Sequence, residues 1–99
     1  MDRVEGVPIV YLLGHTVTGL VKIGRSKRMR QRLKTLQREE GADLVWLSYL
    51  AAFGRDLWRT EDESYWLERD LHKRFAAFRV RGEWFLPADP ILDHFGVVL

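Results

Sequence analysis

A glutamate and a histidine lie four residues apart in the second half of the chain, at Glu68 and His72. Residues at that spacing share one face of a helix, so the two side chains could hold a metal ion. The alternatives are a surface pair, or a buried histidine whose ring is satisfied by the backbone. Two ligands are too few for a structural zinc site. Magnesium needs only one or two carboxylates, because water and substrate phosphate complete its coordination, so Glu68 is a candidate magnesium ligand.

Tyr11 and Lys22 lie within two apolar runs near the start of the chain. A tyrosine in such a run usually packs its ring in the core and leaves its hydroxyl in contact with water, but a lysine is unusual there. If the two runs pair as a hairpin, the two side chains could come near each other. The register decides whether they share a sheet face, and the sequence does not determine it. A partly buried lysine amine could then accept a proton or bind a water molecule.

Basic residues concentrate in one stretch that contains no acidic residue: Lys22, Arg25, Lys27, Arg28, Arg30, Arg32 and Lys34. Such a block is expected where a protein contacts nucleic-acid phosphates, although a solvated helix face would look the same. Within the block, the guanidinium fork of Arg32 could match two oxygens of a phosphate held above the sheet. Its alternative is an ordinary exposed arginine. The predicted DNA contacts are Arg25, Lys27, Arg28, Arg30 and Lys34.

Composition excludes several other chemistries. The chain has 99 residues, 46% of them hydrophobic, and a net charge of +2, which predicts one small domain over residues 1–99 with a real core. The absence of cysteine rules out a thiol nucleophile, a disulfide and a thiolate metal site. Gly14 and Gly19 lack the context of a nucleotide-binding loop. Ser26 and Ser48 have no evident base partner for a hydrolase triad.

The candidate residues need strands and helices that bring them together. Residues 7–13 and 20–24 are expected to form a β-hairpin around the glycine-bounded loop 14–19, and residues 44–53 a third strand. A helix is expected after Ser26, with an apolar stripe of Met29, Leu33 and Leu36, and it should end at Gly41.

Later in the chain, Thr60 and Glu63 match a capping box at the start of a second helix. Its core stripe is Leu67, Leu71 and Phe75. Residues 83–86 predict a short extended or turn segment, in which Trp84 and Phe85 are interpreted as core, and residues 91–95 a last helical turn. The expected order is β-β-α-β-α with a small tail.

The candidate residues also occur in a recognisable order. The run Val10-Tyr11-Leu12 is followed by Val21-Lys22-Ile23-Gly24-Arg25-Ser26, and then by Arg32-Leu33-Lys34-Thr35-Leu36-Gln37. Downstream come residues 68–75, Arg79 and Gly82-Glu83-Trp84-Phe85. This series resembles the GIY-YIG nuclease superfamily, in particular its phage-type branch with a Lys-Ile-Gly second motif and a terminal Gly-Glu-Trp-Phe run. The resemblance spans residues 8–86.

The resemblance implies an α+β fold, with a three-stranded antiparallel sheet flanked by helices. It also implies hydrolysis of a DNA phosphodiester with one divalent ion, Mg²⁺ or Mn²⁺, bound at Glu68. Tyr11 and Lys22 would position the attacking water and take its proton. Arg32 would offset charge on the phosphorus oxygens in the transition state, and Gly24 matches the glycine of the second motif.

The chain departs from the family pattern at four places. Ile9-Val10 replaces Gly-Ile, Lys22 replaces a tyrosine, Leu36 stands where many relatives have a helix histidine, and Glu83-Trp84-Phe85 occupies the region of a family asparagine. His15 or His72 could compensate for the missing groups. Two alternatives to a nuclease are therefore a catalytically weak or inactive DNA-binding module of the same fold, and an interaction domain that uses its aromatic surface.

The expected partner is DNA and not a membrane, because the apolar stretches are too short to span a bilayer. No targeting segment is evident at the N-terminus, so a soluble cytoplasmic protein is the expectation. The domain has no second module to read bases, so it could form a homodimer or rely on a targeting partner.

Overall fold

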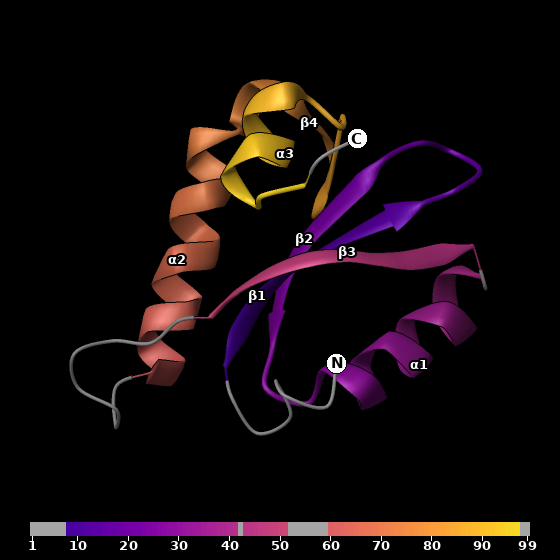
Figure 1. Ribbon diagram of the computed structural model, residues 1–99, viewed down its shortest axis with the longest axis horizontal. Coiled ribbons are helices and arrows are strands. Elements are labelled where there is room, and N and C mark those ends of the chain that lie inside the picture. The colour runs from indigo at the N-terminus through magenta and orange to yellow at the C-terminus, as the bar shows by residue number, and fades with distance from the viewer. Residues whose placement is uncertain (1–7, 42, 52–59, 98–99) are drawn as a thin grey trace.

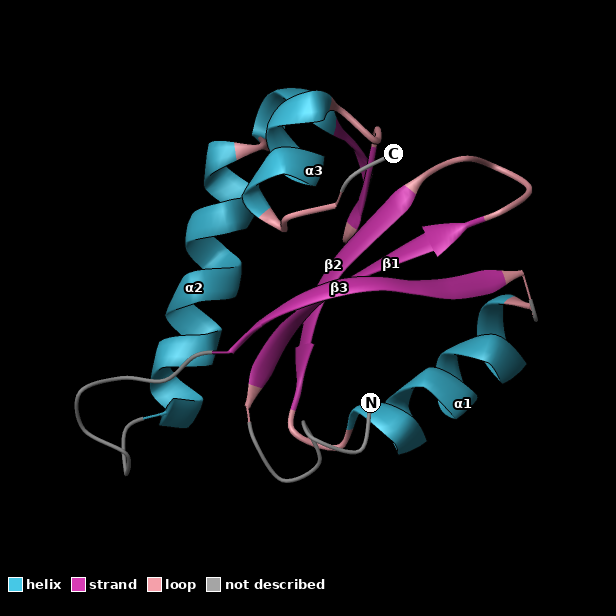
Figure 2. Cartoon of the chain, in the orientation of Figure 1, coloured by secondary structure: helices cyan, strands magenta, loops and turns pink. Residues whose placement is uncertain are grey.

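The computed structural model describes residues 8–41, 43–51 and 60–97. In chain order (Figure 1, Figure 2), the described elements are β1 (Ile9–His15), β2 (Val21–Ser26), α1 (Met29–Glu40), β3 (Leu44–Ala51), α2 (Thr60–Arg74), a short 3₁₀ helix η3 (Ala76–Phe78), β4 (Arg79–Arg81), β5 (Trp84–Phe85) and α3 (Asp89–His94). The α+β class is confirmed. The last two residues of the predicted third strand, 52 and 53, and the capping side chains of Thr60 and Glu63 lie outside the described residues.

The sheet has five strands in the order β3-β1-β2-β5-β4, and all of its neighbouring strands are antiparallel. The prediction of a three-stranded sheet is therefore wrong. The two additional strands are only three and two residues long, too short for a periodic pattern to reveal them. They are held by their pairing with β2 and with each other, so tertiary context decides their conformation.

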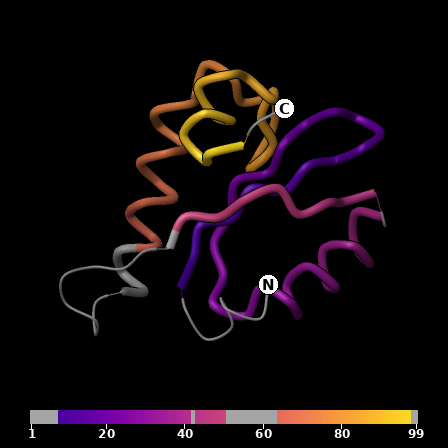
Figure 3. The backbone as a smooth tube through the Cα atoms, in the orientation of Figure 1, coloured from indigo at the N-terminus to yellow at the C-terminus, as the bar shows by residue number. Residues whose placement is uncertain are grey.

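Each face of the sheet carries its own apolar cluster. Ile9, Tyr11 and Leu13 of β1 pack with Met29 and Leu36 of α1 on one face. The alternate β1 residues, Val10 and Leu12, face a second cluster. Residues of α2 and α3, and those directly after each helix, complete it: Leu71, Phe75, Ile91, Leu92 and Phe95. Figure 3 shows α3 folded back beside the C-terminal end of α2. The predicted apolar stripes of both main helices are thus confirmed as core.

The outer edge of β2 is shared between a strand and a helix. β5 pairs only with Val21 and Lys22 of β2. One residue farther on, the carbonyl of Ile23 lies 3.0 Å from Nε2 of His72 on α2. α2 therefore lies beside the part of β2 that β5 does not cover, with His72 at Ile23 and Glu68 at Arg25.

Gly24 is required by a close approach between β1 and β2. Tyr11 and Gly24 are cross-strand partners, and the Tyr11 ring lies directly over the glycine. A Cβ atom built on Gly24 would overlap the Tyr11 hydroxyl and Cζ, and would lie 2.9 Å from Cε1. The glycine of the second motif thus makes room for the tyrosine of the first.

Substitution Gly24→Ala is expected to destabilise the fold by about 1–3 kcal/mol, because the new methyl group would overpack against the Tyr11 ring. Urea denaturation of both proteins measures this difference. In a Tyr11→Ala background the same substitution should cost much less, since the overlapping ring is gone. Equal losses in the two backgrounds would contradict the close approach.

Candidate functional site

A pocket of about 500 Å³ opens where β1, β2, α1, α2 and the β4–β5 turn meet. Its lining combines a phenol, three cationic side chains and two carboxylates, which come from Tyr11, Arg25, Lys27, Arg32, Glu68 and Glu83. Three of the four predicted catalytic residues, Tyr11, Arg32 and Glu68, therefore lie around one cavity. They belong to three different elements, so only the tertiary fold brings them together.

Tyr11 and Arg32 form a hydrogen-bonded pair at the pocket wall. The tyrosine is 1% exposed, and the guanidinium donates to its hydroxyl. Burial, followed by the negative charge of Glu83, raises the pKa of Tyr11 to about 12. The phenol therefore remains protonated at neutral pH and can donate a hydrogen bond into the pocket.

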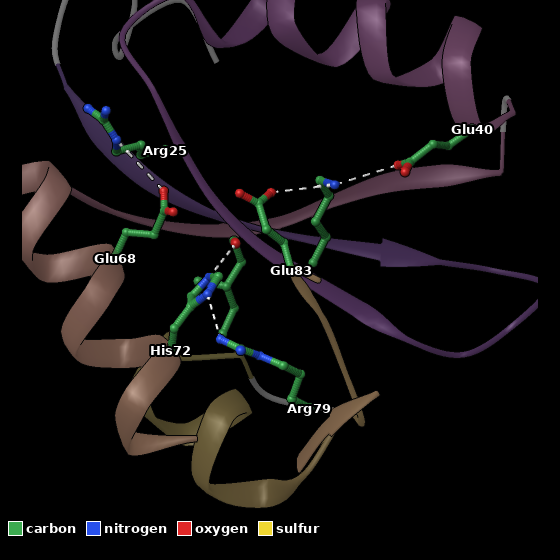
Figure 4. A network of polar contacts seen from close by, with 8 residues as sticks. Arg25, Glu40, Glu68, His72, Arg79 and Glu83 are labelled. Carbon is green, nitrogen blue, oxygen red and sulfur yellow. Dashed lines mark hydrogen bonds and ion pairs between the residues drawn. The ribbon is translucent and has the colours of Figure 1, made fainter. Parts of the chain in front are cut away.

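Glu68 projects from α2 toward the pocket and is partly buried. Its carboxylate lies 3.9 Å from Nε of Arg25, a contact drawn in Figure 4. Burial, followed by the charge of Glu83, raises the pKa of Glu68, although His72, Arg25 and Lys22 oppose this shift. The ionised carboxylate is thus costly in the protein alone, which favours a positive partner in the pocket.

Glu83 is a pocket residue to which sequence analysis assigned no role. It lies in the turn between β4 and β5, and its charge acts on both Tyr11 and Glu68. Its position inside the run Gly82-Glu83-Trp84-Phe85 was the one feature of the sequence that could have indicated a role for Glu83 in the site. Trp84 and Phe85 are 6% and 0% exposed, which confirms their interpretation as core and shows how the strand anchors Glu83 at the pocket.

Lys22 lies beside the pocket but does not line it. Its register with Leu13 puts it on the same sheet face as Tyr11, which the sequence left open. Its amine lies 3.5 Å from Glu83 and 3.8 Å from Glu40, and 5.1 Å from the centre of the Trp84 ring. This buried side chain therefore acts on the pocket by holding the Glu83 carboxylate and by its charge on Glu68.

His72 does not act with Glu68 as a ligand pair. Its Nε2 lies 3.0 Å from the carbonyl oxygen of Ile23, and its Nδ1 lies 3.1 Å from Nη2 of Arg79. A carbonyl can only accept and a guanidinium can only donate, so these contacts fit a neutral ring with its proton on Nε2. The alternative of a histidine satisfied by the backbone describes this residue. His15 is also engaged elsewhere, because its Nδ1 accepts from the amides of Val17 and Thr18.

The predicted DNA-contacting residues divide into two groups. Arg25 and Lys27 line the pocket, and Arg28 lines a shallower hollow that shares Arg32 with it. Arg30 and Lys34 each lie two positions from Arg32, and residues two apart on a helix point in nearly opposite directions. These two basic residues therefore face away from the pocket.

A second hollow continues from the pocket on the other side of Glu68. It is lined by Arg69, Lys73 and Arg79, together with Glu68 and His72. Because Glu68 belongs to both cavities, the pocket lies between two cationic surfaces, one formed by residues 25–32 and the other by α2 and β4. Sequence analysis missed the second surface because its three cations are dispersed over eleven positions.

The donor set fits a hard divalent cation bound mainly by water and substrate. No group of three or more histidine, aspartate or glutamate side chains within the described residues could hold a metal by itself. The two pocket carboxylates, Glu68 and Glu83, repel each other, as the raised pKa of Glu68 indicates. One or two carboxylates with open positions suit magnesium, which retains several waters in its coordination shell.

Residues 9–93 match the T5orf172 domain, and the chain belongs to that family. T5orf172 is a phage-associated domain found in nuclease-like and DNA-binding proteins. The matched region includes every pocket residue named above, since all of them lie between Tyr11 and Glu83. No curated protein and no solved structure matches the chain. Within the described residues, no helix has the length and apolar character needed to cross a membrane.

Substitution Glu83→Gln is expected to lower the pKa of Tyr11 below about 12, because the charge of Glu83 is one of the causes that raise it. Absorbance titration of the phenols measures the shift, and Tyr11→Phe identifies the signal. Glu40→Gln is the matched control, since it also removes a carboxylate beside Lys22 but leaves Glu83 in place. An unchanged Tyr11 titration in Glu83→Gln would refute this electrostatic coupling.

Proposed function

We propose that this chain is a divalent-metal-dependent DNA endonuclease that uses a GIY-YIG type of mechanism. The observation that carries the proposal is the meeting of Tyr11, Arg32 and Glu68 around one polar pocket. Membership of the T5orf172 family supports a DNA-related, endonuclease-like function. The motif resemblance supplies the reaction class, hydrolysis of a phosphodiester bond.

Glu68 would hold Mg²⁺ or Mn²⁺, which when bound supplies positive charge to a phosphate oxygen and to the leaving 3′ oxygen. The guanidinium of Arg32 lies across the same pocket and can bind a non-bridging phosphate oxygen. As negative charge gathers on those oxygens during attack, this hydrogen bond strengthens. Arg32 is therefore assigned to stabilisation of the transition state.

Tyr11 is assigned to orienting the attacking water. Its pKa of about 12 keeps the proton on the phenol, so Tyr11 is not the proton acceptor. The carboxylate of Glu83 lines the same pocket and can accept a hydrogen bond from that water. Lys22, for which a share in the proton transfer was predicted, lies 3.5 Å from Glu83, and we assign it to holding that carboxylate in position.

The cations on both sides of Glu68 would contact the DNA backbone. Arg25, Lys27 and Arg28 lie toward α1, and Arg69, Lys73 and Arg79 lie in the hollow along α2. Contacts of this kind position the duplex without reading its bases. Affinity should therefore fall steeply as salt is raised.

Substitution Arg32→Ala is expected to slow plasmid cleavage by about 10²–10³-fold in the presence of magnesium, as for loss of one donor to a developing oxyanion. Glu68→Ala should abolish cleavage and retain DNA binding. Arg30→Ala is the matched control, because it removes the same charge from the same helix on the side away from the pocket. A wild-type rate in Glu68→Ala would end the proposed mechanism.

Magnesium is expected to raise the melting temperature of the wild-type protein but not that of Glu68→Gln. A ligand at a hundred times its Kd stabilises the fold by about 2.7 kcal/mol. Differential scanning fluorimetry in magnesium and in EDTA measures the difference. Asp70→Asn is a suitable control, since Asp70 is an exposed carboxylate of the same helix that pairs with Arg74. An equal response of wild type and Glu68→Gln to magnesium would place the ion elsewhere.

Without metal, the stability of Glu68→Gln relative to wild type should increase with pH. Burial and Glu83 raise the pKa of Glu68 in the folded state above its unfolded value of about 4.3. Below the unfolded pKa, Glu68 is protonated in both the folded and the unfolded state, so it does not destabilise the wild-type fold. As pH rises from the unfolded pKa through the folded pKa, the cost of ionising Glu68 in the folded state appears and lowers the stability of wild type. Chemical denaturation in EDTA at acidic and neutral pH measures this, and a difference that does not vary with pH would contradict the shift.

A second candidate function is a DNA-binding module that lacks catalysis. It is favoured by Leu36, which is 2% exposed and packed in the core at the position where many GIY-YIG relatives carry a histidine. A wild-type protein that binds DNA but cuts no form of it with magnesium or manganese would support this alternative.

A further inference from the structure

Two aromatic rings stand on the outer surface of α2 beside the pocket. Tyr65 is 38% exposed and Trp66 is 64% exposed, whereas Trp84 is 6% exposed. Their rings are in edge-to-face contact, with centroids 5.3 Å apart. Neither belongs to the two core clusters, so packing of the described core does not account for them.

Arginines hold both rings. The guanidinium of Arg69 lies 5.5 Å from the Tyr65 ring and 5.8 Å from the Trp66 ring, and it donates a 2.8 Å hydrogen bond to the Tyr65 hydroxyl. On the pocket side, the guanidinium of Arg25 lies 5.2 Å from the Tyr65 ring. We call Tyr65, Trp66 and Arg69 the aromatic platform. It combines exposed ring surface with positive charge.

The pocket side of the aromatic platform borders the proposed active site, whereas Trp66 lies two positions from Glu68 and therefore points to nearly the opposite side of α2. Tyr65 lines the pocket, and Arg69 lines the second hollow beyond Glu68. Tyr65 and Glu68 are three residues apart, so they lie on neighbouring turns of one helix face, about 4.5 Å along its axis. Bases in a DNA strand rise about 3.4 Å per step, so the platform lies one to two nucleotides from a phosphate at Glu68.

We propose that Tyr65, which Trp66 and Arg69 hold in place, stacks an unpaired DNA base next to the phosphate bound at Glu68, so that the protein prefers DNA with an unpaired nucleotide at the cleavage site. This inference rests on the proposed function, since it names the substrate class of the same site. A base in an intact duplex has both faces covered by its neighbours, so its use by the rings requires unstacking. An unpaired base offers its face without that cost.

The chemistry of the platform suits a nucleotide as a whole. Exposed aromatic rings provide sequence-tolerant stacking, and the neighbouring guanidiniums add cation–π and phosphate contacts. Arg25 touches both Tyr65 and Glu68, so it can bind the phosphate that follows the stacked base. The charge of this surface complements a nucleic-acid strand.

The test compares binding of two fluorescein-labelled duplexes, one perfectly paired and one identical except for an unpaired thymine bulge. Fluorescence anisotropy in EDTA measures the affinities without cleavage. Wild type should bind the bulged duplex more tightly. Tyr65→Ala should lower affinity for the bulged duplex by about 5- to 100-fold, and affinity for the paired duplex by less than about twofold. Trp66→Ala, which removes only the support of the Tyr65 ring, should have a smaller effect of the same kind.

Two controls accompany these variants. Tyr65→Phe keeps the aromatic face at the pocket and should retain most of the preference. Tyr49→Ala removes a tyrosine of similar exposure, 40%, from β3 outside the pocket lining, and should leave both affinities unchanged. No preference in wild type, or equal losses on both duplexes, would overturn the inference. If wild type shows no preference for the bulged duplex but cleaves paired DNA, the nuclease proposal stands and only this inference is overturned. If the preference is present but no DNA is cleaved, only the nuclease proposal is overturned.

Discussion

The outer edge of β2 has two partners, and the position of the pocket depends on how they divide it. β5 covers Val21 and Lys22, and α2 lies beside the edge from Ile23 onward through His72. Because no strand pairs there among the described residues, a carboxylate on α2 can reach around the edge to the face that carries Tyr11.

Electrostatics separates this pocket from the rest of the described surface. The groups whose pKa is displaced are Tyr11, Arg32 and Glu68, and all three line it. Such clustering of perturbed groups is typical of functional sites. The pocket holds two carboxylates, and burial together with the charge of Glu83 raises the pKa of Glu68 despite the nearby cations. That arrangement disfavours ionisation of Glu68 in the protein alone, and it suits a divalent ion bound together with a phosphate.

The same cations serve two purposes in the structure. Arg25 pairs with Glu68 and lies against Tyr65, while Arg79 holds the ring of His72 that joins α2 to β2. Each guanidinium is positioned by an aromatic ring or a hydrogen bond, which limits the entropy lost on contact with a phosphate. The structure therefore presents charge from ordered side chains around Glu68.

Local pattern in the sequence determined the first three strands, the two long helices and their apolar stripes, because periodicity and turn residues act over a few neighbours. The order of motifs also identified Tyr11, Arg32 and Glu68 as residues of one site. Tertiary structure alone decided the rest: the pairing of β4 and β5, the place of Glu83 in the pocket, and the attachment of Lys22 to Glu83 rather than to the cavity. These depend on register and on contacts between distant segments, which no local pattern encodes.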